Sequence, residues 1–356
     1  MLRALGCKHH TAALRRDMSA GAPESSTSTK HEQPIVRSPI WFTDGNIVLQ
    51  AQSVQFKFYQ NLLAEYALAF FKDAFAIPQP QLDQDSDTVD GCQIMRLPDS
   101  AADVEYMLSF LLEPKSSTLT PCIADVASAL RMSHQYIIPG LWEDAAARLR
   151  FGFPDTLEQY IEKREVIHAY SRIHIKPWQR LRHLVDILQT VGLHRIMAVM
   201  YFCIADTMNV DLLASDAPNA PRLGPVSIQS RCTMLGGRAK LLAASMKCIR
   251  MSLADPSPEP ANCPDPQACG RRRRLLQGKL FARFESDTNV SLLLNWPNFL
   301  SRPQGPSICD ACLLLVRQRR EAELQATWQN LPSFFGLPAW EELKDFELQA
   351  CDDTAY

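Results

Sequence analysis

The chain lacks a long apolar segment. In its most apolar stretch, near residue 200, the longest run free of Lys, Arg, Asp and Glu extends from Ile196 to Ala205. A helix that spans a membrane needs roughly 20 predominantly apolar residues. The sequence therefore predicts a buried helix here and no membrane partner.

The chain also lacks an excess of charge of either sign. Its 356 residues include 37 Lys plus Arg and 39 Asp plus Glu, which gives a formal net charge of -2. This balance produces no long-range field that would attract nucleic acid or an anionic membrane. We expect no nucleic-acid partner unless a local basic patch provides one.

The first twenty residues lack the continuous apolar block of a secretory signal, because Arg3, Lys8 and Arg15 interrupt it. No acidic residue precedes Asp17, so a mitochondrial presequence is the alternative to a disordered basic tail. We expect an intracellular protein, in the nucleus or the cytoplasm. Its 11 cysteines, an odd number, are then expected to be reduced thiols.

Conventional catalytic motifs are missing as well. The sequence contains no HExxH motif, no GxGxxG or GKS/T phosphate cradle, and no recognisable nucleophile-base pair. Gly236-Gly237 predicts a turn, and His134 and His183 lie among helical residues, where a satisfied or exposed imidazole is the common outcome. We therefore expect that the protein is not an enzyme.

The N-terminal residues 1–39 are rich in Ser, Thr, Pro and charge, which predicts a disordered tail. Folded structure is expected from residue 40, with a turn at Asp44-Gly45, a strand that contains Ile47, Val48 and Leu49, and a hairpin partner directly after it. In the second strand, the alternation of apolar and polar residues over 54–58 predicts one buried and one solvated face.

Helical periodicity then replaces strand periodicity. Leu63, Ala67, Phe70 and Ala74 fall on one stripe, which predicts a single helix with a buried face. Further core residues are expected at strand or helix spacing: Phe56, Phe58, Leu108, Leu111, Val126, Leu130 and Trp142.

Residues 40–155 as a whole read as one mixed domain. A short strand at 92–97 precedes paired helices, whose expected starts are Asp99 or Ser100, Thr120-Pro121 and Pro139. A capping box at 155–158 begins a mainly helical region over 156–356. The predicted fold class is α+β.

Several segments together carry a family resemblance. "DGNIVLQAQSVQFKFYQNLLAE", "FAIPQP", "VDGCQIMRLPDSAADVEYMLSFLLEP" and "DVASALRMSHQYIIPGLWEDAAARLR" resemble the BTB/POZ domain of fungal, basidiomycete-type proteins. Downstream, "SICDAC" and "LPSFFGLPAWEELK" are similar to the C-terminal part of the same proteins.

The resemblance implies clustered helices flanked by a small sheet in an interaction module that often forms homodimers. It also implies protein partners, with adaptor roles such as recruiting a cullin to a ubiquitin ligase in some members and transcription regulation in others. Binding, rather than bond chemistry, is the expected function.

The segment 263–312 holds the best-defined candidate site. Cys263-x5-Cys269 and Cys309-x2-Cys312 supply four thiolates that are able to satisfy a structural zinc ion in tetrahedral geometry. The alternatives are that Cys309 and Cys312 are small, partly buried residues at the start of a helix, or a redox-active pair. We expect no cofactor other than this candidate zinc.

Four consecutive arginines at 271–274 follow the second cysteine. Such a run is typical of either a nucleic-acid or nuclear-import patch, or a solvated helix start. Arg317, Arg319 and Arg320 would extend the patch if the cysteines bring the two segments together. The alternative function is therefore a zinc-stapled nuclear transcriptional regulator that contacts DNA through this basic patch.

The aromatic segment 328–343 is dense in Trp and Phe and is interrupted by Pro332, Gly336 and Pro338. It cannot form one helix, so it must fold back on another part of the chain. We expect it to close the helical region as core, packed on helices within 181–203, with an exposed docking patch as the alternative.

Overall fold

The structure is a computed structural model, and its described part begins before the expected domain start. It describes residues 34–66, 70–76, 88–113, 120–170, 172–174, 178–215, 222–256, 260–286 and 308–348. The first strand, β1, spans Val36–Trp41. The boundary of the predicted tail at residue 39 is thus too late, because Val36 and Arg37 already pair with Val54 and Gln55 of another strand. Residues 1–33 of that tail lie outside the described residues.

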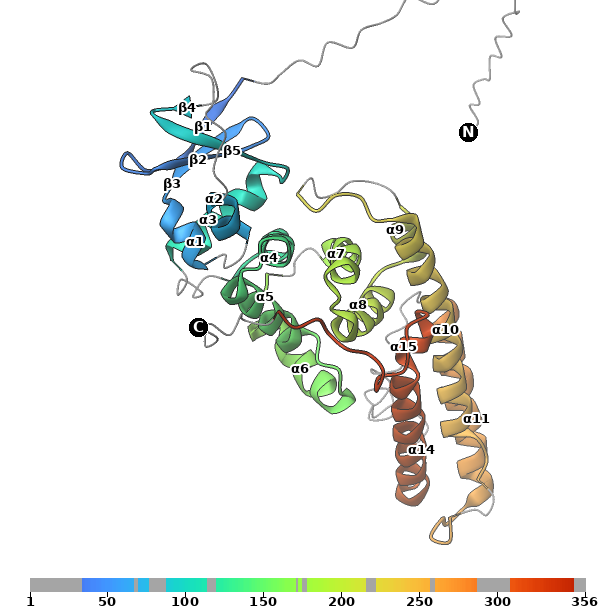
Figure 1. Ribbon diagram of the computed structural model, residues 1–356. Helices are drawn as coiled ribbons and strands as arrows, with labels where there is room; N and C mark the ends of the chain where they lie inside the picture. Colours follow the sequence, from blue (N-terminus) through green and yellow to red (C-terminus); the bar gives the residue numbers. More distant parts are fainter. Residues whose placement is uncertain are drawn as a thin grey trace, which may run out of the picture. The chain divides into compact units, whose positions relative to one another are not determined.

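A small sheet forms the first part of the fold (Figure 1). Its strands are β1, β2 (Ile47–Ala51), β3 (Val54–Phe58), β4 (Thr88–Val89) and β5 (Cys92–Leu97), in the order β1-β3-β2-β5-β4. β2 and β3 form the predicted antiparallel hairpin, whereas β1 pairs with β3 and β5 pairs with β2 in parallel. β4 and β5 are antiparallel.

The inner strand β3 is buried on both faces, which corrects the expectation of one solvated face. Gln55 and Lys57 are only 4% and 5% exposed, alongside the buried Phe56 and Phe58. Their polar ends have partners: Gln55 Nε2 donates to Gln50 Oε1 at 2.9 Å, and Lys57 Nζ donates to the Thr43 carbonyl at 3.1 Å. The parallel strand β1, which the sequence pattern did not predict, covers the edge of β3.

The two edge strands of the sheet approach each other. Arg37 of β1 and Asp90, in the turn between β4 and β5, form an ion pair at 2.9 Å. The sheet therefore curls, since β1 and β4 are at opposite ends of the strand order. Both side chains are largely solvated, so this pair contributes at most about 1 kcal/mol of stability.

The helix predicted after the hairpin is divided. α1 spans Gln60–Tyr66 and α2 spans Phe70–Ala76, and the residues between them lie outside the described part. Leu63 is buried as predicted, but Phe71 is fully buried and Phe70 is 44% exposed. The prediction for Phe70 is wrong because it assumed one continuous helix, whereas α1 and α2 are two separate helices.

Three helices then pack as hairpin-like pairs: α3 (Ala101–Leu112), α4 (Ile123–Tyr136) and α5 (Pro139–Gly152). Ser100 caps α3 by accepting from the Asp103 backbone N–H at 3.1 Å, and α5 begins at Pro139 as predicted. The predicted start at Thr120-Pro121 is wrong. α4 has Cys122 at its N-cap, where the Cys122 backbone N–H donates to Asp125 Oδ2 at 3.0 Å.

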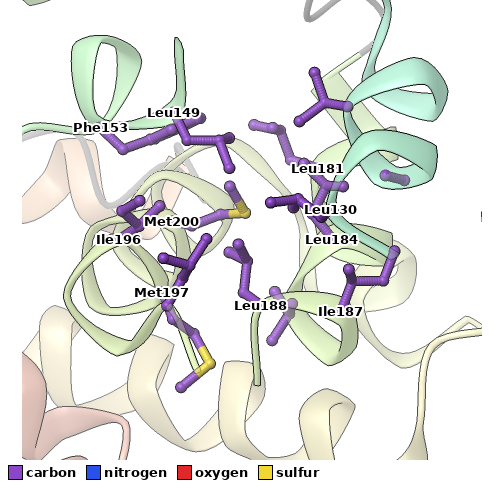
Figure 2. Packing of buried hydrophobic residues seen from close by; sticks show 14 of the residues in the cluster. Leu130, Leu149, Phe153, Leu181, Leu184, Ile187, Leu188, Ile196, Met197 and Met200 are labelled. Atoms are coloured by element: carbon purple, nitrogen blue, oxygen red, sulfur yellow. The ribbon is translucent and has the colours of Figure 1, made fainter. Parts of the chain in front are cut away.

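The remaining expected core residues of this part, Leu108, Leu111, Val126, Leu130 and Trp142, are buried. They are continuous with the core of the helices that follow: α6 (Leu157–Tyr170), the 3-10 helix η1 (Trp178–His183), α7 (Leu184–Val191), α8 (His194–Thr207) and α9 (Val210–Ala214). Figure 2 shows this shared core, in which Leu130 and Leu149 gather with Leu184, Leu188 and Met200. The change near residue 155 is thus one of structure type, since the described residues from Ile35 onward belong to one compact unit.

The predicted apolar segment 196–205 lies inside α8, and nearly every side chain of α8 is buried. Among the residues described, no helix combines the length and the apolar content that crossing a bilayer requires.

Three long helices follow among the described residues: α10 (Ile228–Leu253), α11 (Pro266–Ser286) and α14 (Asp310–Gln329), with α11 and α14 each packed against α10 (Figure 1). The prediction of a turn at Gly236-Gly237 is wrong, because both glycines lie inside α10.

The aromatic segment 328–343 is core, as predicted. It includes the short helix α15 (Leu331–Phe334), and Trp328, Phe335 and Trp340 are each less than 8% exposed. Trp328 lies against Phe202 of α8, and Phe335 stacks on Tyr201 with ring centroids 4.9 Å apart. The fold class is therefore mixed α+β, with a small five-stranded sheet followed by mainly helical structure.

Candidate metal centre

The four predicted cysteines come from the starts of two helices. Cys263 lies in the turn before α11 and Cys269 in the first turns of α11, whereas Cys309 is the N-cap of α14 and Cys312 follows in its first turn. We refer to Cys263, Cys269, Cys309 and Cys312 as the cysteine cluster. Asp265 organises the first pair, because its carboxylate accepts from the Ala268 N–H at 2.9 Å and its carbonyl accepts from the Cys269 N–H at 3.0 Å.

The sulfur atoms of the cluster converge on one point. All four Sγ atoms lie within 4.8 Å of one another, and Cys263 Sγ is 3.6 Å from the Sγ atoms of both Cys309 and Cys312. A tetrahedral site with Zn–S bonds of about 2.3 Å requires S···S separations of about 3.8 Å. A disulfide would need about 2.05 Å. The spacing fits four ligands of one ion and does not fit a cross-link.

The helix starts favour negative charge at the cluster, whereas burial opposes it. Interaction with the backbone of Cys312 lowers the pKa of Cys309, and the N-terminal end of a helix stabilises a thiolate. Burial raises the pKa of Cys312 and that of Cys263. Four thiolates this close repel one another, so full ionisation requires a cation between them.

A buried arginine contacts the cluster. Arg273 is 1% exposed; its Nη1 donates to Cys312 Sγ at 3.4 Å and its Nη2 donates to Asp255 Oδ1 at 3.0 Å. In the sequence Arg273 is one member of a basic run, and that run did not predict this contact. The available signal was its position four residues after Cys269, which puts both side chains on one face of α11.

The arginines of the expected basic patch mostly have partners within the protein. Arg274 Nη1 donates to Asp255 Oδ2 at 2.6 Å, and Arg319 Nη1 donates to the Ala254 carbonyl at 2.9 Å. Arg271, by contrast, is exposed, as is Arg317. The cysteines do bring α11 and α14 together, with Arg273, Arg274 and Arg319 of the expected patch engaged by partners within the protein.

A pocket with a volume of about 740 Å³ lies elsewhere, beside the start of α8. Arg195 organises it: its Nε donates to Asp155 Oδ2 at 2.7 Å, and its backbone N–H donates to Asp345 Oδ1 at 2.8 Å. Burial raises the pKa of Asp345. Two ion pairs engage charges of the pocket lining: Arg195 with Asp155 at 2.7 Å, and Arg150 with Asp345 at 3.9 Å.

No protein-family model, no curated protein and no solved structure matches the chain.

Proposed function

We propose that the cysteine cluster binds one structural zinc ion. The observation that carries this proposal is the convergence of four sulfurs at the separations that tetrahedral zinc requires. Four thiolates leave no open coordination position, so the ion acts as a cross-link and not as a catalyst. It holds the starts of α11 and α14 together.

Metal analysis of the purified full chain tests this proposal. Protein prepared without chelator should contain about one zinc per chain, and Cys309→Ser should lose it. Cys232→Ser is the matched control, because Cys232 is an exposed cysteine of α10 outside the cluster. Equal metal content in the two variants would exclude the cluster as the binding site.

We further propose that the protein works as a protein-protein interaction adaptor through its N-terminal module, which we define as residues 36–152. The proposal rests on the resemblance of this module to BTB/POZ domains. It is supported by an architecture of the implied kind, in which a small sheet precedes the paired helices α3, α4 and α5. Self-association follows from the same resemblance, and a cullin of a ubiquitin ligase is one candidate partner.

Light scattering on the full chain tests self-association. The proposal predicts about twice the chain mass of 40.1 kDa, whereas a monomer mass at every concentration would contradict it.

Co-elution with a purified cullin tests whether a cullin is a partner. A dimer that fails to co-elute would restrict the proposal to self-association and leave adaptor function without support.

A further inference from the structure

The cluster has a fifth component, the guanidinium of Arg273. Arg273 lies among the largest fully buried side chains of the described residues, together with Arg182 and residues such as Tyr136 and Phe56. A buried cation is costly unless it has anionic or hydrogen-bonding partners. The partners of Arg273 are a ligand sulfur, Cys312 Sγ, on one side and the Asp255 carboxylate on the other.

Helix geometry explains why this arginine, and not its neighbours, meets the cluster. Cys269 and Arg273 are four residues apart on α11, so they lie one above the other on the same face. Both are buried, whereas Arg271 and Arg272 lie on exposed faces of the same helix. The position of Arg273 in the run of four arginines is therefore set by the cysteine before it.

Charge balance gives this contact a role. A divalent ion held by four thiolates leaves a net charge of about -2, which is unfavourable next to buried groups. A guanidinium stays protonated in proteins and presents several N–H donors in a fixed plane. An N–H that donates to a thiolate spreads its charge and fixes its orientation, and such outer contacts tune metal affinity.

We propose that Arg273 is a positioning residue of the metal centre: it donates to the Cys312 thiolate, offsets the charge of the loaded site and thereby raises its affinity for the ion. Asp255 fixes the guanidinium from the opposite side, because its two oxygens accept from Arg273 and Arg274. This inference rests on the proposed zinc binding.

Zinc affinity of the full chain, measured by competition with a chromophoric chelator, tests the proposal. Arg273→Met keeps much of the side-chain volume and removes the charge and donors, so its affinity should fall about 10- to 100-fold. Arg271→Met removes an exposed arginine of the same run and should leave the affinity unchanged. Circular dichroism of the zinc-free proteins reports whether each variant is folded.

Two further readouts separate this role from a merely structural one. In the cobalt-substituted protein, Arg273→Met should shift the thiolate-to-cobalt charge-transfer band, whereas Arg271→Met should not. Arg273→Lys should restore part of the affinity, because an ammonium keeps the charge but loses the planar donor geometry. An unchanged band, or a lysine variant no better than methionine, would overturn the proposed role.

The outcomes distinguish the two proposals. Wild-type protein that binds no zinc would overturn both the zinc centre and the role of Arg273. Wild-type protein that binds zinc, with equal affinities for Arg273→Met and Arg271→Met, would overturn only the role of Arg273. If Arg273→Met does not fold, comparison of Arg273→Lys with Arg271→Lys decides, and equal affinities would again overturn it.

Discussion

Gly237 lies directly against the ring of Phe335: a methyl group at position 237 would be 2.0 Å from Phe335 Cε1. Because glycine has no side chain, the ring of Phe335 occupies the space beside α10 that a side chain at position 237 would take. The same ring stacks on Tyr201 of α8 with an interplanar angle of 12°. One glycine therefore permits α10, α8 and the aromatic segment 328–343 to meet.

Gly237→Ala should destabilise the protein by about 1–3 kcal/mol, because the new methyl forces the Phe335 ring to shift in a packed core. Gly236→Ala is the matched control, since a methyl there meets no atom within 4 Å. Alanine in an exposed helix interior should stabilise by about 0.5–1 kcal/mol. Urea unfolding of both variants checks the prediction, and equal shifts of the same sign would contradict the packing described.

This pair also shows what periodicity and composition predict and what they miss. Local signals placed the hairpin, the Ser100 cap and the buried stripes of α3, α4 and α5, because each depends on residues close in sequence. From the local sequence, Gly236-Gly237 predicts a turn. Its true role depends on Phe335, and no local pattern reveals which distant side chain will fill a missing one.

The strand β1 and the split after Tyr66 were missed for related reasons. β1 pairs in parallel with β3. Lys57 of β3 is buried, although the alternation of apolar and polar residues predicted that it would face solvent. The apolar stripe, taken as one helix across α1 and α2, predicted that Phe70 is buried, whereas Phe71 is the buried residue. In both cases the tertiary partner decides the outcome.

Asp103 is expected to contribute strongly to stability. It is 6% exposed and accepts from Arg131 Nε at 3.1 Å, from Arg131 Nη2 at 2.7 Å and from the Ser128 hydroxyl. Asp103→Asn should cost about 2 kcal/mol, since it leaves the Arg131 charge without its carboxylate. Chemical denaturation at pH 7 measures this, and Asp73→Asn, at an exposed position of α2, should change stability by less than about 0.5 kcal/mol.

The same carboxylate makes an acid-dependent contribution. Burial acts to raise the pKa of Asp103, but hydrogen bonds from Arg131 and Ser128 outweigh it and hold that pKa below its ordinary value. The contribution is therefore present above the unfolded-state value of about 3.9 and is lost as pH falls through the lower folded-state value. Asp103→Asn should lose less stability than wild type over that range, and parallel curves would contradict this assignment.

His183 should make the protein less stable at mildly acidic pH. It is 3% exposed, and its Nδ1 is 2.7 Å from the Gly224 carbonyl oxygen. Burial, with help from the charges of Arg182 and Arg180, lowers the pKa of His183, although the Gly224 carbonyl and Asp186 oppose this.

The folded state therefore favours the neutral ring, and its contribution is lost as pH falls below the unfolded-state value of about 6.5. Between pH 7.5 and 5.5, wild type should lose more unfolding free energy than His183→Gln. Equal losses in the two proteins would show that His183 takes up its proton as easily when folded as when unfolded.

Duplex DNA should bind weakly and with little dependence on salt. Arg273 and Arg274 are engaged by Asp255, and Arg319 by the Ala254 carbonyl, so they do not form a free cationic surface. Each phosphate contact contributes about -0.9 to the slope of log affinity against log salt. We expect a slope near zero in a fluorescence titration, whereas a slope of about -3 or steeper would support the DNA-binding alternative.

The candidate site could be predicted from the sequence only in part. The spacings Cys263-x5-Cys269 and Cys309-x2-Cys312 predicted the four candidate ligands, and the structure brings all four together. The sequence also left open that Cys309 and Cys312 are small, partly buried residues at a helix start, and this also holds, because Cys309 occupies the N-cap position of α14 and Cys312 is buried. Arg273 is one of four consecutive arginines. Only its position four residues after Cys269, on the same helix face, distinguishes it from Arg271.

X-ray absorption spectroscopy of the zinc-loaded full chain determines whether Cys263, Cys269, Cys309 and Cys312 together hold one zinc ion. We expect a first coordination shell of four sulfur atoms at about 2.3 Å. A shell that contains nitrogen or oxygen ligands, or a chain that retains no zinc, would contradict it.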